Sequence, residues 1–314
     1  MPMPAMETVS YPPWITPGVR YMVGSAFFFS AMSLGVKLVG QRIPSQEVVL
    51  VRGVLNAAFT YAMLRRARVR PWGNQPSVLI LRGLFGFLAL SCVYYALVHL
   101  PLADATVLQY TNPIWTALLA AWLLGERMRK WEVVLVLASL LGVLLIARPA
   151  FLFGGAAARL DLLAVAVALV GSMFSAGAYV TVRQLARTED PLVIVFYFTL
   201  VTVAGSLPGT MIAPVWPEPR EWAILLLVAL TAQAGQVLLT RGLQLEPAGR
   251  ATAIGYLQIV FAAVWGAVVF AEYPDGWVIA GAGVILGSTL VLVRLHSRAA
   301  SIAPSVTPVS RESG

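Results

Sequence analysis

Long apolar runs separated by short polar turns dominate this chain. A hydrocarbon core of about 30 Å requires about 20 consecutive apolar residues in a helix, and each run approaches or exceeds that length. The pattern therefore predicts ten transmembrane helices, at residues 19–40, 46–64, 76–97, 103–124, 131–148, 160–184, 191–212, 221–243, 248–270 and 276–295. The connections between the runs are short, which leaves no room for a soluble domain.

The two ends of the chain depart from this pattern. Residues 1–18 and 296–314 are rich in Pro, Ser and Thr, a composition that favours disordered tails. The first apolar run is too long for a signal-peptide core and has no small-residue cleavage site. We therefore expect it to remain as the first membrane anchor.

The apolar part of the chain repeats itself at an offset of 146 residues. Aligned pairs include Phe28 and Phe174, Lys37 and Arg183, Tyr110 and Tyr256, Glu126 and Glu272, Trp131 and Trp277, and Arg148 and Arg294. Five spans per repeat is an odd number, so the second copy must cross the membrane upside down. Inverted repeats of this kind are typical of secondary transporters, whose binding sites lie between them. The expected fold is an all-α integral membrane protein in which two inverted five-helix repeats, residues 19–148 and 149–295, surround a central cavity.

Composition supports the membrane assignment and gives its orientation. Hydrophobic residues make up 59% of the chain and charged residues 11%, which excludes an ordinary soluble domain. A net charge of +8 would suit a nucleic-acid partner, but the positions of the cations argue against one. With a cytoplasmic N-terminus, the basic run at 65–70 and most other cations fall inside, and only four remain outside: Arg42, Arg148, Arg159 and Arg220. This bias predicts a multi-pass protein of the cytoplasmic (inner) membrane with both termini in the cytoplasm.

Few residues could support metal binding or catalysis. Cys92 is the only cysteine, and His99 and His296 are the only histidines. We therefore expect no intramolecular disulfide, no metal site and no cofactor. The sequence also lacks G-x-S-x-G and H-E-x-x-H motifs, so an intramembrane enzyme is not expected.

Several short motifs follow one another through the third to fifth spans. They are Tyr94-Tyr95-Ala96-Leu97, Pro101-Leu102-Ala103-Asp104-Ala105-Thr106, Asn112-Pro113-Ile114-Trp115 and Leu124-Gly125-Glu126-Arg127. The second half repeats parts of them, notably at 239–243 and at the turn containing Glu272, where Ala271 replaces the glycine. Together they resemble the EamA family of the drug/metabolite transporter superfamily over roughly residues 20–295. The resemblance implies a carrier that works by alternating access through a central cavity, and it does not name a solute.

Polar residues on the eighth span indicate one wall of such a cavity. Gln233, Gln236, Thr240 and Gln244 are spaced three, four and four residues apart and therefore share a helical face. Polar groups facing lipid would cost several kcal/mol each. We expect this face to line the cavity; the alternative is that it hydrogen-bonds a neighbouring helix.

The fourth and ninth spans carry polar residues at corresponding positions. Gln109 and Asn112 lie beside Pro113 in the fourth span, and Tyr256 and Gln258 lie in the ninth. The proline frees a backbone carbonyl one turn earlier, which can accept a hydrogen bond from water or solute. Because the repeats are inverted, these residues are expected to meet near the pseudo-two-fold axis.

Aromatic residues at depth complete the apolar part of the predicted cavity. Trp115 and Trp265 lie deep in the fourth and ninth spans, and Tyr94 lies in the third. A tryptophan ring could stack on a planar solute; the alternative is ordinary packing with its N–H satisfied. Serines on the first and sixth spans are expected to hydrogen-bond their own helices.

Three cations fall inside predicted spans: Lys37, Arg52 and Arg82. A central Arg costs about 2.5–3.5 kcal/mol on insertion scales, so such residues usually face a cavity or a partner. Arg52 could instead pair with Glu47, and Arg82 could extend to the headgroups. Arg183 and Arg241 lie near the inner ends of their spans and are expected to extend to the headgroups. No Asp or Glu occupies the middle of a span. The cavity is therefore expected to be electropositive, and a buried proton relay is not expected.

These observations predict a secondary transporter for a small polar organic solute, a metabolite or amino-acid-like compound bearing a carboxylate or phosphate. We expect an exporter or exchanger whose only partners are the solute and membrane lipid. The alternatives are an importer of a vitamin-like or nucleotide-like solute and a non-transporting structural or receptor-like membrane protein. Gly283 and Gly287 predict close helix packing within the monomer, with a homodimer contact as the alternative.

Overall fold

The computed structural model describes residues 15–39, 42–100, 108–126, 128–147, 161–212, 214–271 and 274–302. In these residues every regular element is a helix. The first half contributes α1 (Pro17–Val39), α2 (Ser45–Ala67), α3 (Pro76–His99), α5 (Asn112–Leu124) and α6 (Lys130–Ala147). The second half contributes α8 (Leu162–Leu185), α9 (Pro191–Ile212), α10 (Pro219–Leu245), α11 (Ala248–Ile254), α12 (Leu257–Phe270) and α13 (Gly276–Ile302).

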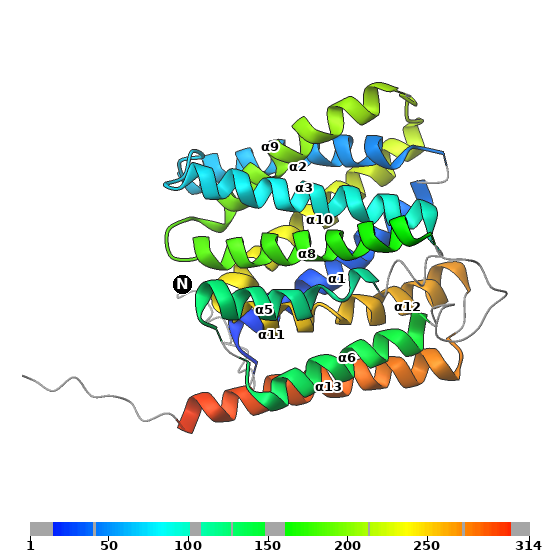
Figure 1. The fold of residues 1–314 in the computed structure, drawn as a ribbon. Helices are drawn as coiled ribbons and strands as arrows, with labels where there is room; N and C mark the ends of the chain where they lie inside the picture. Colours follow the sequence, from blue (N-terminus) through cyan, green and yellow to red (C-terminus); the bar gives the residue numbers. More distant parts are fainter. Residues whose placement is uncertain are drawn as a thin grey trace, which may run out of the picture.

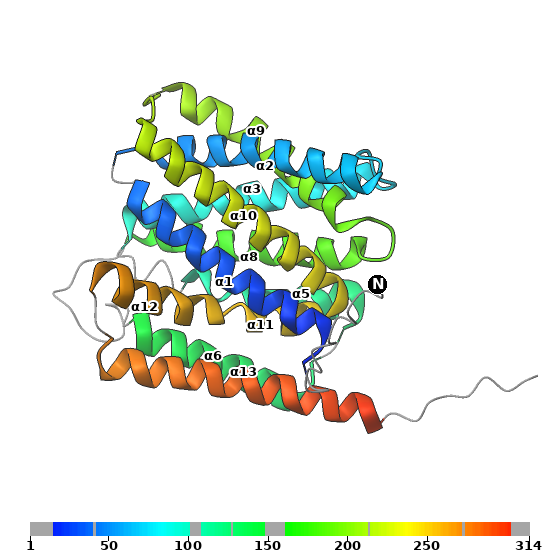
Figure 2. The same ribbon diagram turned by 180° about the vertical axis from the view of Figure 1, so that it is seen from behind.

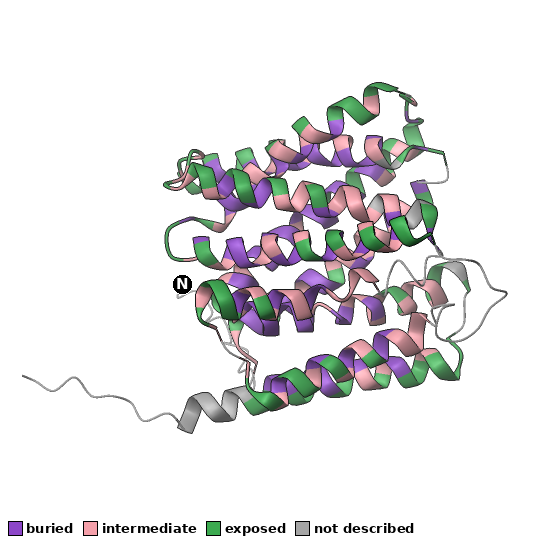
Figure 3. Cartoon of the chain, viewed as in Figure 1, coloured by how far each residue is buried: buried purple, intermediate pink, exposed green. Residues whose placement is uncertain are grey.

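The helices run side by side in one bundle (Figure 1). Nine described segments, with α11 and α12 counted as one, are long and apolar enough to cross a membrane, and α5 belongs to the tenth crossing. Many outward-facing side chains are large and apolar, including Leu118, Trp122 and Val134. Figure 3 shows exposed positions on the outer surfaces of the helices and buried ones between them. Such a surface requires lipid, which confirms the prediction of a multi-pass membrane protein.

Packing between the two halves follows the sequence repeat. Helix α1 packs on α10, and α3 packs on α8. At the 146-residue offset α1 aligns with α8 and α3 aligns with α10. The α1–α10 and α3–α8 contacts are therefore equivalent under the repeat. In addition, α2 packs on its counterpart α9, and α6 on its counterpart α13. Figures 1 and 2 show this interleaving from two sides, and it confirms the predicted fold of two inverted five-helix repeats.

One predicted boundary and two predicted helices need correction. Helix α13 continues to Ile302, so the predicted boundary at residue 295 falls inside a helix. The fourth and ninth crossings were also predicted as continuous helices, and both are interrupted. A turn at Tyr110 and Thr111 precedes α5, and a turn at Gly255 and Tyr256 separates α11 from α12.

The two breaks occupy corresponding positions in the repeats, since Tyr110 aligns with Tyr256. At each break the backbone forms shorter-range hydrogen bonds, from Thr111 N–H to the carbonyl of Leu108 and from Tyr256 N–H to that of Ala253, both at 3.2 Å. In the first repeat Pro113 contributes, because it cannot donate the helical hydrogen bond. Broken helices at the interface of inverted repeats place irregular backbone where a transporter needs polar groups.

Helices α6 and α13 form a separate pair at one side of the bundle (Figure 1). Gly142 and Gly281 allow them to approach closely, because a Cβ on Gly281 would lie 2.6 Å from the carbonyl oxygen of Gly142. Ser139 and Ser288 hydrogen-bond across the pair at 2.7 Å. The predicted packing role of Gly283 and Gly287 is wrong within the described chain, since a Cβ at either residue would meet no atom within 4 Å.

We call the end of the bundle where α1 begins and α13 ends the terminal end, and the opposite end the distal end. In a Cys92→Ser background, Lys130→Cys and Gly276→Cys should react with a membrane-impermeant maleimide from opposite sides. Both positions are exposed, and they begin aligned helices of inverted repeats. The measurement is labelling of intact and of opened cells; modification of both cysteines from one side would contradict the inverted topology.

Candidate functional site

A cavity of about 770 Å³ lies between the two repeats. The lining residues that the structure describes come from α1, α2, α3, α5, α8, α9, α10, α11 and α12, and none of them comes from the α6–α13 pair. Both helix breaks reach it, through Tyr110 in one repeat and Gly255 in the other. The Tyr256 hydroxyl donates a 2.9 Å hydrogen bond to the carbonyl of Tyr110, and their ring centroids are 5.7 Å apart. The cavity therefore lies where the pseudo-symmetry places a midplane site.

Most of the residues proposed from the sequence lie on this cavity. They come from both repeats and from six different crossings: Lys37, Arg52, Arg82, Gln109, Asn112, Gln236, Gln258 and Trp265. The Trp265 indole N–H donates to the Ser30 hydroxyl at 3.0 Å, which fixes the ring against the wall. Ser30 and Ser33 also hydrogen-bond back to carbonyls of their own helix, as predicted.

The polar face of α10 is divided between two roles, which corrects the prediction that all of it lines the cavity. Gln236 reaches the cavity, and its amide nitrogen has no hydrogen-bond partner in the part of the chain that the structure describes. Gln233 instead donates to the Thr60 hydroxyl at 2.8 Å and joins α10 to α2. Thr240 is fully buried and donates to the carbonyl of Gln236. Gln244 donates to the carbonyl of Glu189.

Three further predicted residues do not contribute a lining side chain that the structure describes. Trp115 lies outside the cavity wall, and its buried indole N–H has no partner among the residues described. Tyr256 is fully buried behind Tyr110, which itself lines the cavity. The side chain of Tyr94 lies outside the described part of the chain.

Arg52 faces the cavity from α2 and does not pair with Glu47 in the described residues. Its Nη1 approaches the Met32 sulfur at 3.4 Å, which is a weak interaction. The Glu47 carboxylate accepts a 2.9 Å hydrogen bond from the backbone N–H of Val215. The alternative of an ion pair that only braces α2 is therefore wrong.

Arg82 is more deeply enclosed than the sequence indicates. Only 2% of the residue is exposed, and its guanidinium carbon lies 4.2 Å from the centre of the Phe198 ring. Its Nε and Nη1 groups are buried, and neither has a hydrogen-bond partner among the described residues. Arg82 therefore does not extend to the headgroups, and the alternative of an interfacial Arg is wrong.

Sequence reasoning missed several lining residues, of which Asn56 is the most informative. It is buried on α2, lines the cavity and leaves its amide oxygen without a partner. Asn56 lies four residues after Arg52, so the helical spacing places both on one face. That spacing could have identified it. Thr199 and Phe198 of α9 also line the cavity, and no pattern in their span distinguishes them.

The terminal end of the bundle is closed by charged contacts between the repeats. Glu126, after α5, forms a 2.6 Å ion pair with Arg183 of α8 and accepts a 3.0 Å hydrogen bond from the Ala248 N–H at the start of α11. Arg183 also donates to the carbonyl of Gln244 at 2.6 Å. The expectation that Arg183 extends to the headgroups is therefore wrong.

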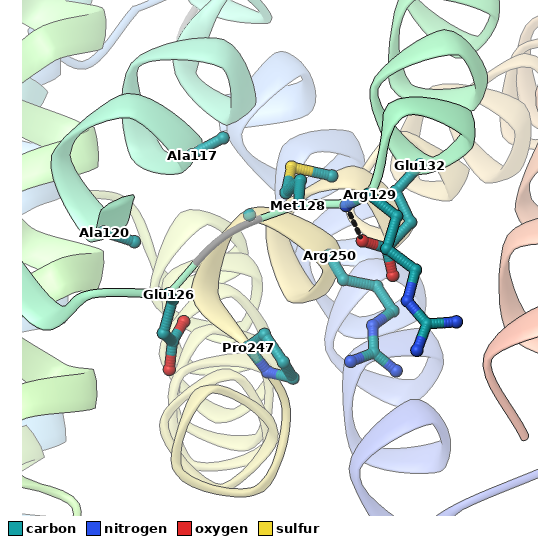
Figure 4. Close-up of a pocket in the computed structure, with 9 residues that line it drawn as sticks. Ala117, Ala120, Glu126, Met128, Arg129, Glu132, Pro247 and Arg250 are labelled. Atoms are coloured by element: carbon teal, nitrogen blue, oxygen red, sulfur yellow. Dashed lines mark hydrogen bonds between the residues drawn. The ribbon is translucent and has the colours of Figure 1, made fainter. Parts of the chain in front are cut away.

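A smaller pocket of about 110 Å³ lies beside this contact. Figure 4 shows Glu126 at one side of it and Arg129, Glu132 and Arg250 at the other. The Glu132 carboxylate accepts a 2.7 Å hydrogen bond from the Arg129 N–H, and Arg250 pairs with Glu246 at 3.0 Å. These carboxylates are already engaged, and the described residues contain no cluster of three or more His, Cys, Asp or Glu that could hold a metal ion.

Comparison with known proteins places this geometry in context. The model of the EamA-like transporter family matches residues 16–148 and 162–294, one copy for each repeat. A solved crystal structure aligns with a TM-score of 0.76 over 90% of this chain and 98% of that chain, at 21% identity, which shows the fold.

Three curated relatives bear names that describe transport. The pseudopaline exporter CntI of Pseudomonas aeruginosa is 34% identical over 88% of this chain and 96% of its own length. Human solute carrier family 35 member G1 is 29% identical over 87% of this chain and 78% of its own length. An S-adenosylmethionine uptake transporter of Rickettsia prowazekii is 26% identical over 73% of this chain and 75% of its own length.

Proposed function

The chain belongs to the EamA-like transporter family and is a membrane transporter, not an enzyme. From this premise we propose that it moves a small polar organic solute bearing a carboxylate or phosphate by alternating access, as an exporter or exchanger. We also propose that it lies in the cytoplasmic membrane with both termini in the cytoplasm, because most of its cations then fall on the cytoplasmic side.

The charge of the cavity carries the solute proposal. Arg52, Arg82 and Lys37 line it, and no Asp or Glu is among the described lining residues. An electropositive field counts for more in this low-dielectric interior than in water. Guanidinium groups also match the two oxygens of a carboxylate or phosphate with their planar fork. Asn56 and Gln109 each leave an amide oxygen unpartnered, which suits a solute that also has N–H groups.

Two observations support export or exchange without tight proton coupling. The relative named as an exporter aligns over 96% of its own length. A carrier that moves protons commonly uses a buried carboxylate as a relay, and the described lining residues supply none. The Rickettsia relatives named as uptake transporters favour the alternative direction, which is import of a nucleotide-like solute.

Purified protein in proteoliposomes tests the proposal. Radiolabelled succinate, L-glutamate, L-glutamine and L-lysine would be compared with protein-free vesicles as the control. We expect the anionic solutes to enter the vesicles faster than glutamine and lysine. Unlabelled anion on the opposite side of the membrane should accelerate this uptake, and dissipating a proton gradient should change the uptake rate little. Preferential transport of lysine would contradict the charge argument, and a strict dependence on the proton gradient would contradict exchange.

Gln236 and Gln233 provide a matched pair for testing the cavity wall. Gln236→Leu should lower transport about tenfold, because it removes a polar group that faces the solute and a hydrogen bond to a charged group contributes about 1.5–3 kcal/mol. Gln233→Leu should change transport less than about twofold, since Gln233 contacts Thr60 away from the cavity. Initial rates in proteoliposomes, normalised to folded protein, measure both. Equal rates for the two variants would show that Gln236 is also a packing residue.

A further inference from the structure

Of the cations that the structure describes, Arg82 has the most buried N–H groups without a hydrogen-bond partner. It is 2% exposed, and both Nε and Nη1 are buried without a hydrogen-bond partner. The residues around it offer no counter-ion: its guanidinium lies over the Phe198 ring, and no ion pair joins it to a described carboxylate. Of the other two buried cations that the structure describes, Arg250 pairs with Glu246, and Arg52 contacts only the Met32 sulfur. Arg82 therefore differs from a cation that braces the fold.

Burial of this charge costs folding free energy. A buried guanidinium that lacks a carboxylate loses its hydration and is not repaid by pairing. A contact with an aromatic ring returns only part of that cost. Charged residues retained inside a membrane domain at such a cost usually mark a substrate or ion pathway. The cavity wall at Arg82 is where an anionic group could supply the missing partner.

The two lining arginines lie at different depths. Arg82 is six residues into α3 from the terminal end, about 9 Å along the axis at about 1.5 Å per residue. Arg52 is seven residues into α2 from the distal end, about 10 Å. Helices α2 and α3 run in opposite directions (Figure 1). Their bounds therefore put Arg82 toward the closed terminal end and Arg52 toward the distal end.

We propose that Arg82 forms a deep anion subsite, in which its Nε and Nη1 groups donate hydrogen bonds to a carboxylate or phosphate group of the solute. In the conformation described, the solute lies with this anionic group toward the terminal end. Arg52 is the outer cation of the same cavity. The inference rests on the proposed function and narrows it, because it names the residue that recognises the anion and the orientation of the bound solute.

Thermal unfolding and transport together test the subsite. Arg82→Met removes the charge and keeps the length of the side chain, whereas Arg82→Lys keeps a positive charge. Arg65→Met is the control, because Arg65 is an exposed cation on α2. The probes are succinate and inorganic phosphate, with succinamide as the neutral match. Each protein would be unfolded in detergent with and without probe, and succinate transport would be measured in proteoliposomes.

Without probe, Arg82→Met should unfold at the same temperature as wild type or higher, because the buried unpaired charge is gone. It should lose the anion-dependent rise in unfolding temperature and about tenfold or more of transport. Arg82→Lys should keep part of both, and Arg65→Met should match wild type.

Two contrary outcomes have different meanings. If Arg82→Met unfolds at a lower temperature yet keeps the anion-dependent shift, Arg82 is a structural brace and the subsite is wrong, whereas the proposed function stands. If neither succinate nor phosphate stabilises wild type or is transported by it, the proposed function fails together with the subsite.

Discussion

Glu126→Gln is expected to open the terminal end of the transporter and to abolish most transport. Glu126 lies in the turn after α5 and joins that turn to two other segments. Its carboxylate forms an ion pair with Arg183 of α8 and accepts a hydrogen bond from the Ala248 N–H of α11. Both ionic side chains are about a quarter exposed, so the isolated pair contributes little to folding. Its expected effect is instead on the equilibrium between conformations, because alternating access requires the terminal end to open and opening would separate these segments.

Thr252 provides a reporter for this change. It lines the cavity near its terminal side and is buried in the closed conformation. In a background without Cys92, Thr252→Cys should react with a membrane-impermeant maleimide from the terminal side about fivefold faster or more when Glu126 is Gln, the lower range of typical coupling between conformations. Transport should fall about tenfold, because a carrier held open at one end cannot complete its cycle.

Arg183→Gln and the double variant complete the cycle of comparisons. If the two residues act through one contact, the double variant should resemble either single variant. Effects that simply add would show that Glu126 acts through Ala248 alone. Unchanged labelling in all three variants would show that the ion pair does not control closure.

The transmembrane architecture could be predicted because it depends on features that a sequence displays directly. The length of each apolar run determines whether it spans the bilayer, and the 146-residue offset reveals the inverted repeat. The helix breaks were harder to predict. Pro113 marks the first, but its counterpart Ile259 can donate a helical hydrogen bond, so the break before it depends on packing around Gly255 and Tyr256.

The sequence predicts which residues belong to the site more readily than what each of these residues does there. Gln233 and Gln236 share a helical face, yet that face is wide enough to contact α2 on one side and the cavity on the other. The depth of Arg82 along its helix is equally compatible with the headgroups and with the interior. Its contact with Phe198, which is 116 positions away in the sequence, shows that Arg82 lies in the interior. Residue spacing within one helix contains no information about such a partner.

Gly281→Val should destabilise the protein by about 3 kcal/mol, near the upper end of the usual cost of overpacking. Helices α6 and α13 approach so closely that a Cβ on Gly281 would meet the carbonyl oxygen of Gly142 at 2.6 Å and the Ile146 side chain at 2.7 Å. A backbone carbonyl cannot rotate away as a side chain can, so the two helices must separate. Separation would also break the hydrogen bond between Ser139 and Ser288.

Gly287→Val on the same helix is the matched control, because a Cβ there meets no atom within 4 Å and valine has a higher helix propensity than glycine. Unfolding temperature in detergent should fall by several degrees for Gly281→Val and stay within a degree or two for Gly287→Val.

Size-exclusion chromatography adds a second measurement. If Gly283 and Gly287 form a homodimer contact, Gly287→Val should reduce the apparent mass without lowering the stability of the monomer. A similar loss of stability in both variants would contradict the tight packing assigned to Gly142 and Gly281. Since no described lining residue of the cavity belongs to α6 or α13, folded Gly281→Val protein should still bind solute with wild-type affinity.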